Sequence, residues 1–205
     1  MRYYFDTSTL FIRGNFRAVS TGIAGGIRSV STIINQTVPA GWSHEDPEKE
    51  LEFIAAGSGI DRAFFGLLTA VPVQQCCILQ YDYVTVFITA GVRREPPANA
   101  GTINIIVFSN EGMEDAALLE TIMVATEAKA EALLAMGLPL TGTPTDAVIV
   151  GCEGGGTTPV CRATHGYWQA YSRSSTSRYT GSHQTPRRSR SVQPFLIFHL
   201  QPFQW

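Results

Sequence analysis

The stretch from Gly101 to Gly151 constrains the fold of this chain more than any other. Residues 102–108 form a β-branched, apolar run of strand length. Residues 113–136 contain no Gly or Pro and are rich in Ala, Leu, Glu and Met, which favour a helix. A polar turn follows, and residues 147–150 are a short, wholly apolar strand. Two strands joined by a helix predict a crossover with parallel pairing, and hence an α/β or α+β domain with a mixed sheet.

The predicted helix carries apolar residues at three- and four-residue steps, which indicates one inward face. Gly137 follows the helix at the position where a C-terminal cap glycine belongs. On this interpretation the inward face consists of Ala116, Leu119, Met123, Thr126, Ala130 and Leu133.

The remaining strands are expected at residues 18–21, 65–71 and 83–90, and helix 113–136 should pack against this sheet. An edge strand or hairpin is expected within Met1–Arg13, and a helix should run from Pro47 to about Ala56. Two prolines within residues 93–100 predict an exposed loop.

Charge divides the chain into a domain, residues 1–159, and a tail, residues 160–205. The domain holds all 17 acids and 9 of the 15 Lys and Arg residues, a net charge of −8, whereas the tail holds six Arg and no acid. The four cysteines lack metal-ligand spacing, and no apolar run reaches the roughly 20 residues of a membrane span. These features predict a cytoplasmic protein without a metal site or membrane span.

Six short segments together resemble the adenosylcobinamide amidohydrolase family of archaeal cobamide salvage. They are STGIAGG (20–26), GLLTAV (66–71), ITAGV (88–92), GTINIIV (101–107), ATEAKAEAL (125–133) and TGTPTDAVIV (141–150). The resemblance covers roughly residues 15–159. It implies hydrolysis of the aminopropanol amide of adenosylcobinamide to adenosylcobyric acid. The corrinoid is then a small-molecule substrate rather than a cofactor, and any cofactor is left unassigned. A non-catalytic module that binds a corrinoid or nucleotide is the alternative.

Two acids are the candidate catalytic residues. Glu127 lies among Met123, Ala130 and Leu134, so its carboxylate is expected to border the buried face and to have a raised pKa. A surface acid paired with a cation is the equally weighted alternative. Asp146 ends a threonine-rich turn, where Asp usually caps the turn, and the resemblance favours a functional role.

The candidate substrate-binding residues lie in the same motifs. Gly25 and Gly26 would allow close approach of a ligand or a tight turn, and Asn104 would serve a substrate or a structural hydrogen bond. Lys129 would hold an anionic group or remain solvated. The others are the turn residues Thr141, Thr143 and Thr145. His44 is the only histidine outside the tail and hence the only possible base of a Ser-His-Asp arrangement. Cys152 is a candidate nucleophile, although a lone cysteine after an apolar strand is more often buried packing.

The tail predicts a shifted reading frame after Pro159. The resemblance implies a YAG-type motif, a Gly-Arg pair and a closing amphipathic helix here, whereas the printed tail is rich in Ser, Thr and Arg. If the coding sequence is read one base further on from the Pro159 codon, permitted codon choices encode the peptide PYAGPRTGIGRPIHEAVLRGIPEAIRRR. This peptide contains the expected features. The printed tail is therefore not interpreted as a nucleic-acid-binding arm, and no nucleic-acid partner is expected. A chain with this tail is expected to be poorly ordered after Pro159 and weakly active or inactive.

Overall fold

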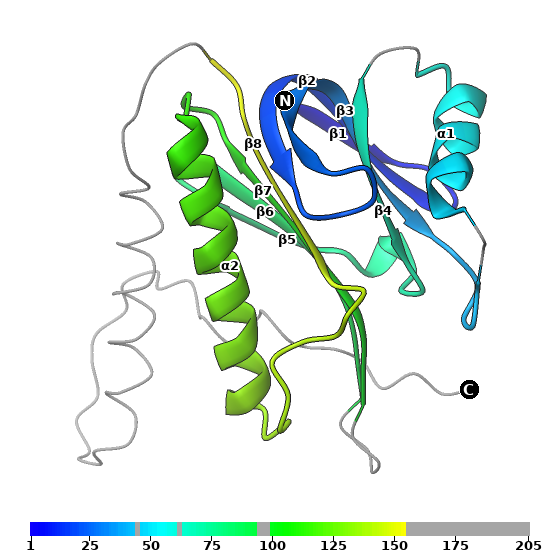
Figure 1. Cartoon of the computed structure of the whole chain (residues 1–205), viewed down its shortest axis with the longest axis vertical. Helices are drawn as coiled ribbons and strands as arrows, with labels where there is room; N and C mark the ends of the chain where they lie inside the picture. The colour runs from blue at the N-terminus through cyan, green and yellow to red at the C-terminus, as the bar shows by residue number, and fades with distance from the viewer. Residues whose placement is uncertain (44–45, 61–62, 94–98, 155–205) are drawn as a thin grey trace, which may run out of the picture. The chain divides into compact units, whose positions relative to one another are not determined.

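The 101–151 stretch folds as the sequence predicts, into strand β7 (Asn99–Ser109), helix α2 (Asp115–Ala135) and strand β8 (Ala147–Cys152). The computed structural model describes residues 1–43, 46–60, 63–93 and 99–154. Strands β7 and β8 pair in parallel, with Asn104 opposite Ala147. The parallel pair and its connecting helix are confirmed, and α2 lies along the outer face of these strands (Figure 1).

Within the described residues, eight strands form one mixed sheet in the order β4-β3-β2-β8-β7-β6-β5, and β1 pairs with β2 beside this path. The pairs β3–β4 and β7–β8 are parallel and the other pairs are antiparallel. The elements not yet bounded are β1 (Arg2–Phe5), β2 (Thr9–Ser20), β3 (Gly26–Thr37), α1 (Pro47–Gly57), β4 (Phe64–Thr69), the 3₁₀ turn η1 (Val73–Gln75), β5 (Cys77–Tyr81) and β6 (Val84–Arg93).

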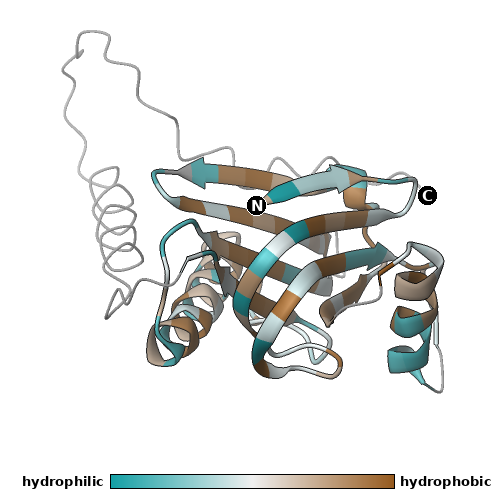
Figure 2. Ribbon diagram, turned by 90° about the horizontal axis from the view of Figure 1, so that it is seen from above, coloured by the Kyte–Doolittle hydropathy of each residue, from teal (hydrophilic) through white to brown (hydrophobic). Residues whose placement is uncertain are grey.

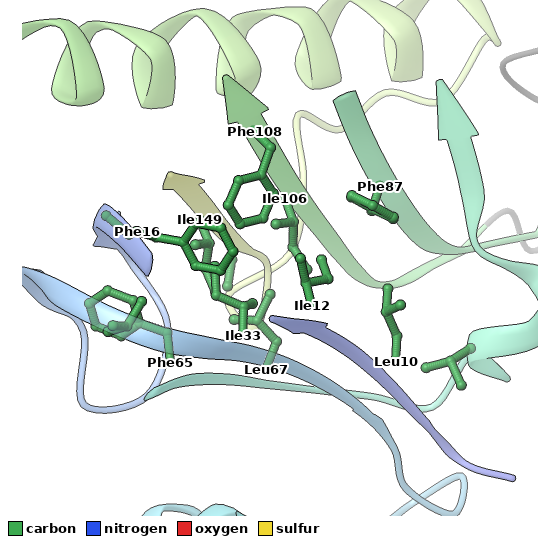
Figure 3. Packing of buried hydrophobic residues seen from close by; sticks show 14 residues of the cluster. Leu10, Ile12, Phe16, Ile33, Phe65, Leu67, Phe87, Ile106, Phe108 and Ile149 are labelled. Atoms are coloured by element: carbon green, nitrogen blue, oxygen red, sulfur yellow. The ribbon is translucent and has the colours of Figure 1, made fainter. Parts of the chain in front are cut away.

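The sheet folds over on itself, because strand β2 is long and its register with β3 shifts between Arg13 and Phe16. The first half of β2 pairs with β1, and the second half pairs with β8. One half of the sheet consists of β1–β4 and the other of β5–β8. The main core lies between these halves and includes Phe16 and Phe65 from the first and Phe87 and Phe108 from the second (Figure 3). Figure 2 shows hydrophobic residues, coloured brown, interspersed with more polar ones along the strands.

Each helix covers one outer face of the folded sheet. Helix α1 packs Ala55 against Phe11 and Ile34, and Asp46 caps its first turn by accepting a hydrogen bond from the Lys49 amide at 3.2 Å. Helix α2 packs against the strands β7 and β8. The described elements therefore form four layers, with the two helices outside and the two sheet halves inside.

The inward face of α2 differs from the sequence prediction. Ala117, Leu118, Thr121 and Leu133 are its buried residues. Leu119 and Met123 were expected inside, but they are 47% and 63% exposed. The prediction failed because α2 carries Ala, Leu or Met on several faces, so more than one face satisfies a three- and four-residue spacing. The predicted cap is confirmed, since Gly137 has φ +79° and the Leu138 amide donates to the Leu133 carbonyl at 3.0 Å.

Most other boundaries moved by a few residues, but the strand expected at 18–21 is only the end of β2, which begins at Thr9. Strands β3 and β5 were missing from the predicted sheet, whereas the predicted hairpin at the N-terminus is confirmed as β1 and β2. The predicted loop 93–100 is shorter than expected, because β6 reaches Arg93 and β7 begins at Asn99. Strand β5 was missed because it is an edge strand of only five residues.

Candidate functional site

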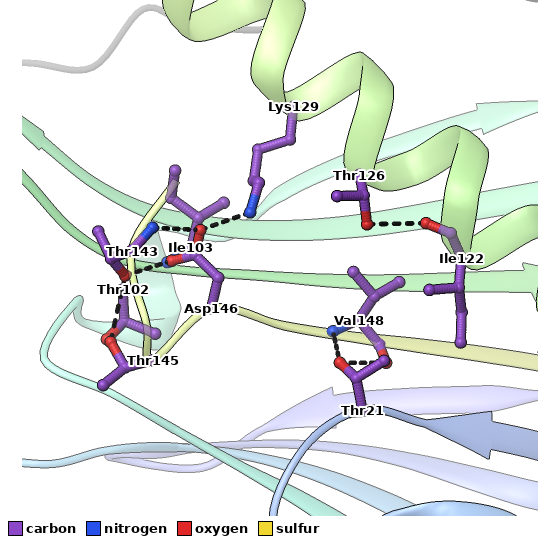
Figure 4. A network of polar contacts seen from close by, with 10 residues as sticks. All are labelled: Thr21, Thr102, Ile103, Ile122, Thr126, Lys129, Thr143, Thr145, Asp146 and Val148. Atoms are coloured by element: carbon purple, nitrogen blue, oxygen red, sulfur yellow. Dashed lines mark hydrogen bonds and ion pairs between the residues drawn. The ribbon is translucent and has the colours of Figure 1, made fainter. Parts of the chain in front are cut away.

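The threonine-rich turn between α2 and β8 is organised around the carboxylate of Asp146 (Figure 4). Lys129 of α2 donates to Asp146 Oδ2 at 2.6 Å, and the Thr143 amide donates to the same oxygen at 3.0 Å. The second oxygen, Oδ1, accepts the Thr143 hydroxyl at 2.6 Å and the Ile103 amide of β7 at 2.8 Å. Four donors therefore fix this carboxylate between a helix, a strand and its own turn.

Asp146 is held in its ionised form. The exposed fractions of the Lys129 and Asp146 side chains are 11% and 6%, so the pair is largely removed from water. Burial acts to raise the pKa of Asp146, but the hydrogen bonds from Lys129, from Thr143 and from the Ile103 amide outweigh it and leave the pKa below its usual value. A carboxylate with this environment positions its neighbours and is a weak acceptor of protons.

The backbone at Gly142 leaves room for the Lys129–Asp146 pair. Its φ is +151°, and a Cβ built at this position would overlap Lys129 Nζ and Asp146 Oδ2. A side chain at residue 142 therefore requires the pair to move. This close approach explains why residue 142 in the TGTPTDA motif is a glycine.

The glycine-rich segment 20–26 lies at the same end of the sheet as the threonine turn. It forms the connection from β2 to β3, and Thr21 joins it to β8: the Val148 amide donates to Thr21 Oγ1 at 2.9 Å, and the Thr21 amide donates to the Val148 carbonyl at 3.0 Å. Both Gly25 and Gly26 serve this tight turn. A Cβ at Gly25 would overlap backbone oxygens, and Gly26 has φ +110°.

The structure does not add Glu127 to this group. Glu127 is exposed, as are Met123 and Leu134, which were expected to bury its flank. The expectation that its carboxylate borders the buried face is wrong, because the opposite side of α2 faces the sheet. Lys129, two residues further along the helix, points to the threonine turn instead.

Asn104 lies on the inner face of β7, in the core between the sheet halves. It is 1% exposed, and its Nδ2 donates to Asn35 Oδ1 at 3.1 Å and to the Leu68 carbonyl at 3.0 Å. Asn35 in turn donates to Thr89 Oγ1 at 3.1 Å. Asn104 Oδ1 accepts no hydrogen bond from the described residues. Since alternate residues of a strand point to opposite faces, Asn104 points away from α2 and from Lys129.

Cys152 is 1% exposed, and its thiol accepts a hydrogen bond from the Met113 amide at 3.3 Å. Burial is the main reason why its pKa is raised, so a thiolate nucleophile is disfavoured at this position. Cys76, Cys77 and Cys152 are free thiols. Within the described ranges, no three His, Cys, Asp or Glu side chains gather as metal ligands.

A shallow hollow of about 300 Å³ lies elsewhere, along β2 and β3. It shares no residue with the glycine segment or the threonine turn. Its one charged residue, Arg17, makes a two-point ion pair with Asp115 at 2.6 and 2.9 Å. The hollow is therefore separate from the glycine segment and the threonine turn.

Among the expected residues, the structure thus brings together Lys129, Thr143, Thr145 and Asp146. Thr141, at the start of the turn, is exposed. Sequence reasoning did not single out two further threonines, Thr21 and Thr102, although both stand in the quoted motifs. Thr102 Oγ1 lies 2.7 Å from Thr145 Oγ1. The sequence signal that could have identified them is a threonine at the end of a strand, next to a polar turn.

Comparison with known proteins identifies the family. A family model described as adenosylcobinamide amidohydrolase matches residues 4–168. The chain belongs to this family. It is an amidohydrolase by this membership, as the resemblance of its motifs predicted.

Two relatives share this name. The adenosylcobinamide amidohydrolase of Methanosarcina mazei is 46% identical over 155 residues, covering 75% of this chain and 78% of that protein. The adenosylcobinamide amidohydrolase of Halobacterium salinarum is 34% identical over 166 residues, covering 69% of this chain and 68% of that protein. No solved structure matches the chain.

No helix within the described part of the chain is long and apolar enough to cross a membrane. The predicted features of the tail, residues 160–205, and the candidate base His44 lie outside the described residues.

Proposed function

We propose that this amidohydrolase cleaves the aminopropanol amide of adenosylcobinamide in corrinoid salvage. Water adds across the C–N bond: its hydroxyl joins the carbonyl carbon and its proton joins the nitrogen. The products are adenosylcobyric acid and aminopropanol. The observation that carries the proposal is the family match over residues 4–168, together with 46% identity to a relative of that name.

The geometry supports a site at the end of the sheet where the motif residues meet. The glycine segment 20–26 and the turn 141–146 are far apart in sequence, and two hydrogen bonds between Thr21 and Val148 join the glycine segment to β8 just after the turn. We place the substrate against these segments, within reach of Thr141, Thr143 and Thr145. Lys129 acts here by holding Asp146.

Asn104 has a supporting role in this proposal, because its amide is buried beneath the site. It joins β7 to β3 and β4 across the core. Gly25 and Gly26 likewise shape the loop that faces the substrate. In this proposal Asp146 orders the turn. Glu127 stays a candidate acid or base from the sequence motif alone, because it lies on the exposed side of α2.

Incubation of purified protein with adenosylcobinamide tests the function. Mass spectrometry should detect aminopropanol and adenosylcobyric acid in equal amounts. Asp146→Asn should lower kcat/KM by at least tenfold, because Lys129 then lacks its anionic partner. Glu127→Gln should lower kcat and flatten its pH profile if Glu127 transfers protons, and full turnover by this variant would remove it from the mechanism. Binding without turnover by a chain whose frame after Pro159 is restored would favour the non-catalytic alternative.

The tail remains part of the proposal: residues 160–205 are translated in a shifted frame. The match of the family model stops at residue 168, so most of the tail lies outside it. Sequencing the gene around the Pro159 codon tests the idea, and an uninterrupted frame for the printed tail would refute it. A chain with the frame restored should turn over faster than the printed one.

A cytoplasmic location also belongs to this proposal. The free thiols of Cys76, Cys77 and Cys152 fit a reducing compartment.

A further inference from the structure

A chain of three threonine hydroxyls leads from the buried Asp146 carboxylate to the surface (Figure 4). Thr143 Oγ1 lies 2.6 Å from Asp146 Oδ1, Thr145 Oγ1 lies 3.2 Å from Thr143 Oγ1, and Thr102 Oγ1 lies 2.7 Å from Thr145 Oγ1. Thr145 is exposed and Thr102 is half-buried. The inner end of this hydroxyl chain is charged, and its outer end reaches solvent.

The ionised carboxylate sets the direction of every hydrogen bond in the hydroxyl chain. A carboxylate only accepts, and a hydroxyl has one proton to donate. The Thr143 hydroxyl therefore donates to Asp146, which obliges Thr143 Oγ1 to accept from Thr145. Thr145 Oγ1 must then accept from Thr102. Lys129 stabilises this direction of donation, from Thr102 to Thr145 to Thr143, by keeping Asp146 ionised.

The outer end consequently offers only acceptors. Thr102 has used its proton on Thr145 and retains two lone pairs, and Thr145 retains one. A ligand group placed against these oxygens must be a donor, such as an amide N–H or an alcohol O–H. A ligand carboxylate has no proton to donate, so its oxygens would be repelled by these acceptor oxygens. The hydroxyl chain thus distinguishes an amide from the corresponding acid.

We propose that Thr102 is a specificity-determining residue that accepts a hydrogen bond from an N–H or O–H of the aminopropanol amide, with Lys129 and Asp146 as positioning residues behind it. This inference rests on the proposed function, because it names the substrate group that the site reads. Hydrolysis replaces the amide N–H by a carboxylate, which lacks a donor. The same contact therefore favours substrate binding and weakens product binding.

Three variants test the contact by equilibrium dialysis with adenosylcobinamide and, separately, with adenosylcobyric acid. Thr102→Val should weaken substrate binding roughly 3- to 10-fold, the effect of one lost hydrogen bond, and should leave product binding unchanged. Thr102→Ser retains the hydroxyl and should restore substrate binding. Thr126→Val is the matched control, because Thr126 is an exposed threonine whose hydroxyl donates to the Ile122 carbonyl at 2.8 Å on α2. Kinetics should show the Thr102→Val effect in KM rather than kcat.

Equal weakening for substrate and product, or failure of Thr102→Ser to restore binding, would overturn the specificity role. A titration of aspartate carboxyl groups by ¹³C NMR tests the hydroxyl chain without any substrate. Thr143→Val removes a donor and should raise the pKa of Asp146, whereas the control Thr126→Val should not change it. An unchanged pKa in Thr143→Val would overturn the proposed direction of the hydrogen bonds.

These readouts separate the two proposals. If neither the printed chain nor the chain with the frame restored binds or hydrolyses adenosylcobinamide, the proposed function and the substrate contact both fail, and the NMR titration still decides the direction of the hydroxyl chain. If the chain hydrolyses adenosylcobinamide and Thr102→Val binds it normally, the function stands and the Thr102 contact fails.

Discussion

Replacing Lys129 with methionine should destabilise the protein, because it leaves the Asp146 carboxylate in a largely dry site. Loss of one partner from a fully buried ion pair costs about 3–5 kcal/mol. The side chains of Lys129 and Asp146 are 11% and 6% exposed, and three other donors to Asp146 remain. We therefore expect the free energy of unfolding to fall by about 2–3 kcal/mol at pH 7.

Urea unfolding measures this loss, and the pH dependence identifies its cause. The folded pKa of Asp146 lies below its usual value, so the charged carboxylate contributes stability above the unfolded pKa of about 3.9. That contribution is lost as the pH falls through the folded pKa. A protonated Asp146 carries no charge for Lys129 to balance. The difference in the free energy of unfolding between the variant and the unmodified protein should therefore shrink as the pH falls below about 4.

The chain supplies a matched control, since it has only two lysines and both pair with aspartate. Lys49 pairs with Asp46 at 3.0 Å on the surface of α1, and Lys49→Met should leave stability nearly unchanged. The double variant Lys129→Met with Asp146→Asn should lose less stability than the sum of the single losses. A Lys129→Met loss below about 1 kcal/mol, or one that persists unchanged at low pH, would refute the reasoning.

Three further outcomes follow from the described contacts. Asn104→Leu should lower the free energy of unfolding by about 2 kcal/mol in urea melts, because Asn35 Oδ1 and the Leu68 carbonyl lose their donor, and a change within 0.5 kcal/mol would contradict this. Gly142→Ala should reduce both stability and turnover, since its Cβ displaces the ion pair, and normal melting would count against that view. Cys76 should resist alkylation at pH 8 in the folded protein, because burial raises its pKa to about 12; rapid labelling would show otherwise.

Local sequence patterns predicted the elements that position the site. The β-branched runs of β7 and β8, the helix formers of α2 and the cap at Gly137 all act within a few residues of the chain. Such short-range preferences survive in any tertiary context that accommodates them. The family motifs likewise predicted Asp146 and its threonines as a group, since they are neighbours in sequence.

Contacts between distant segments were decided by the tertiary structure. Helix α2 carries apolar side chains on several faces, so only docking against the sheet determined that Leu118 lies inside and that Met123 and Glu127 lie outside. The folding of the sheet brought Asn35 of β3 against Asn104, so that Asn104 makes the structural hydrogen bond that was one of its two expected roles. The partnership of Lys129 with Asp146 across 17 residues arose in the same way. The spacing of residues along the chain predicts which of them share a face of a helix or strand. Which other element contacts that face is decided by tertiary packing.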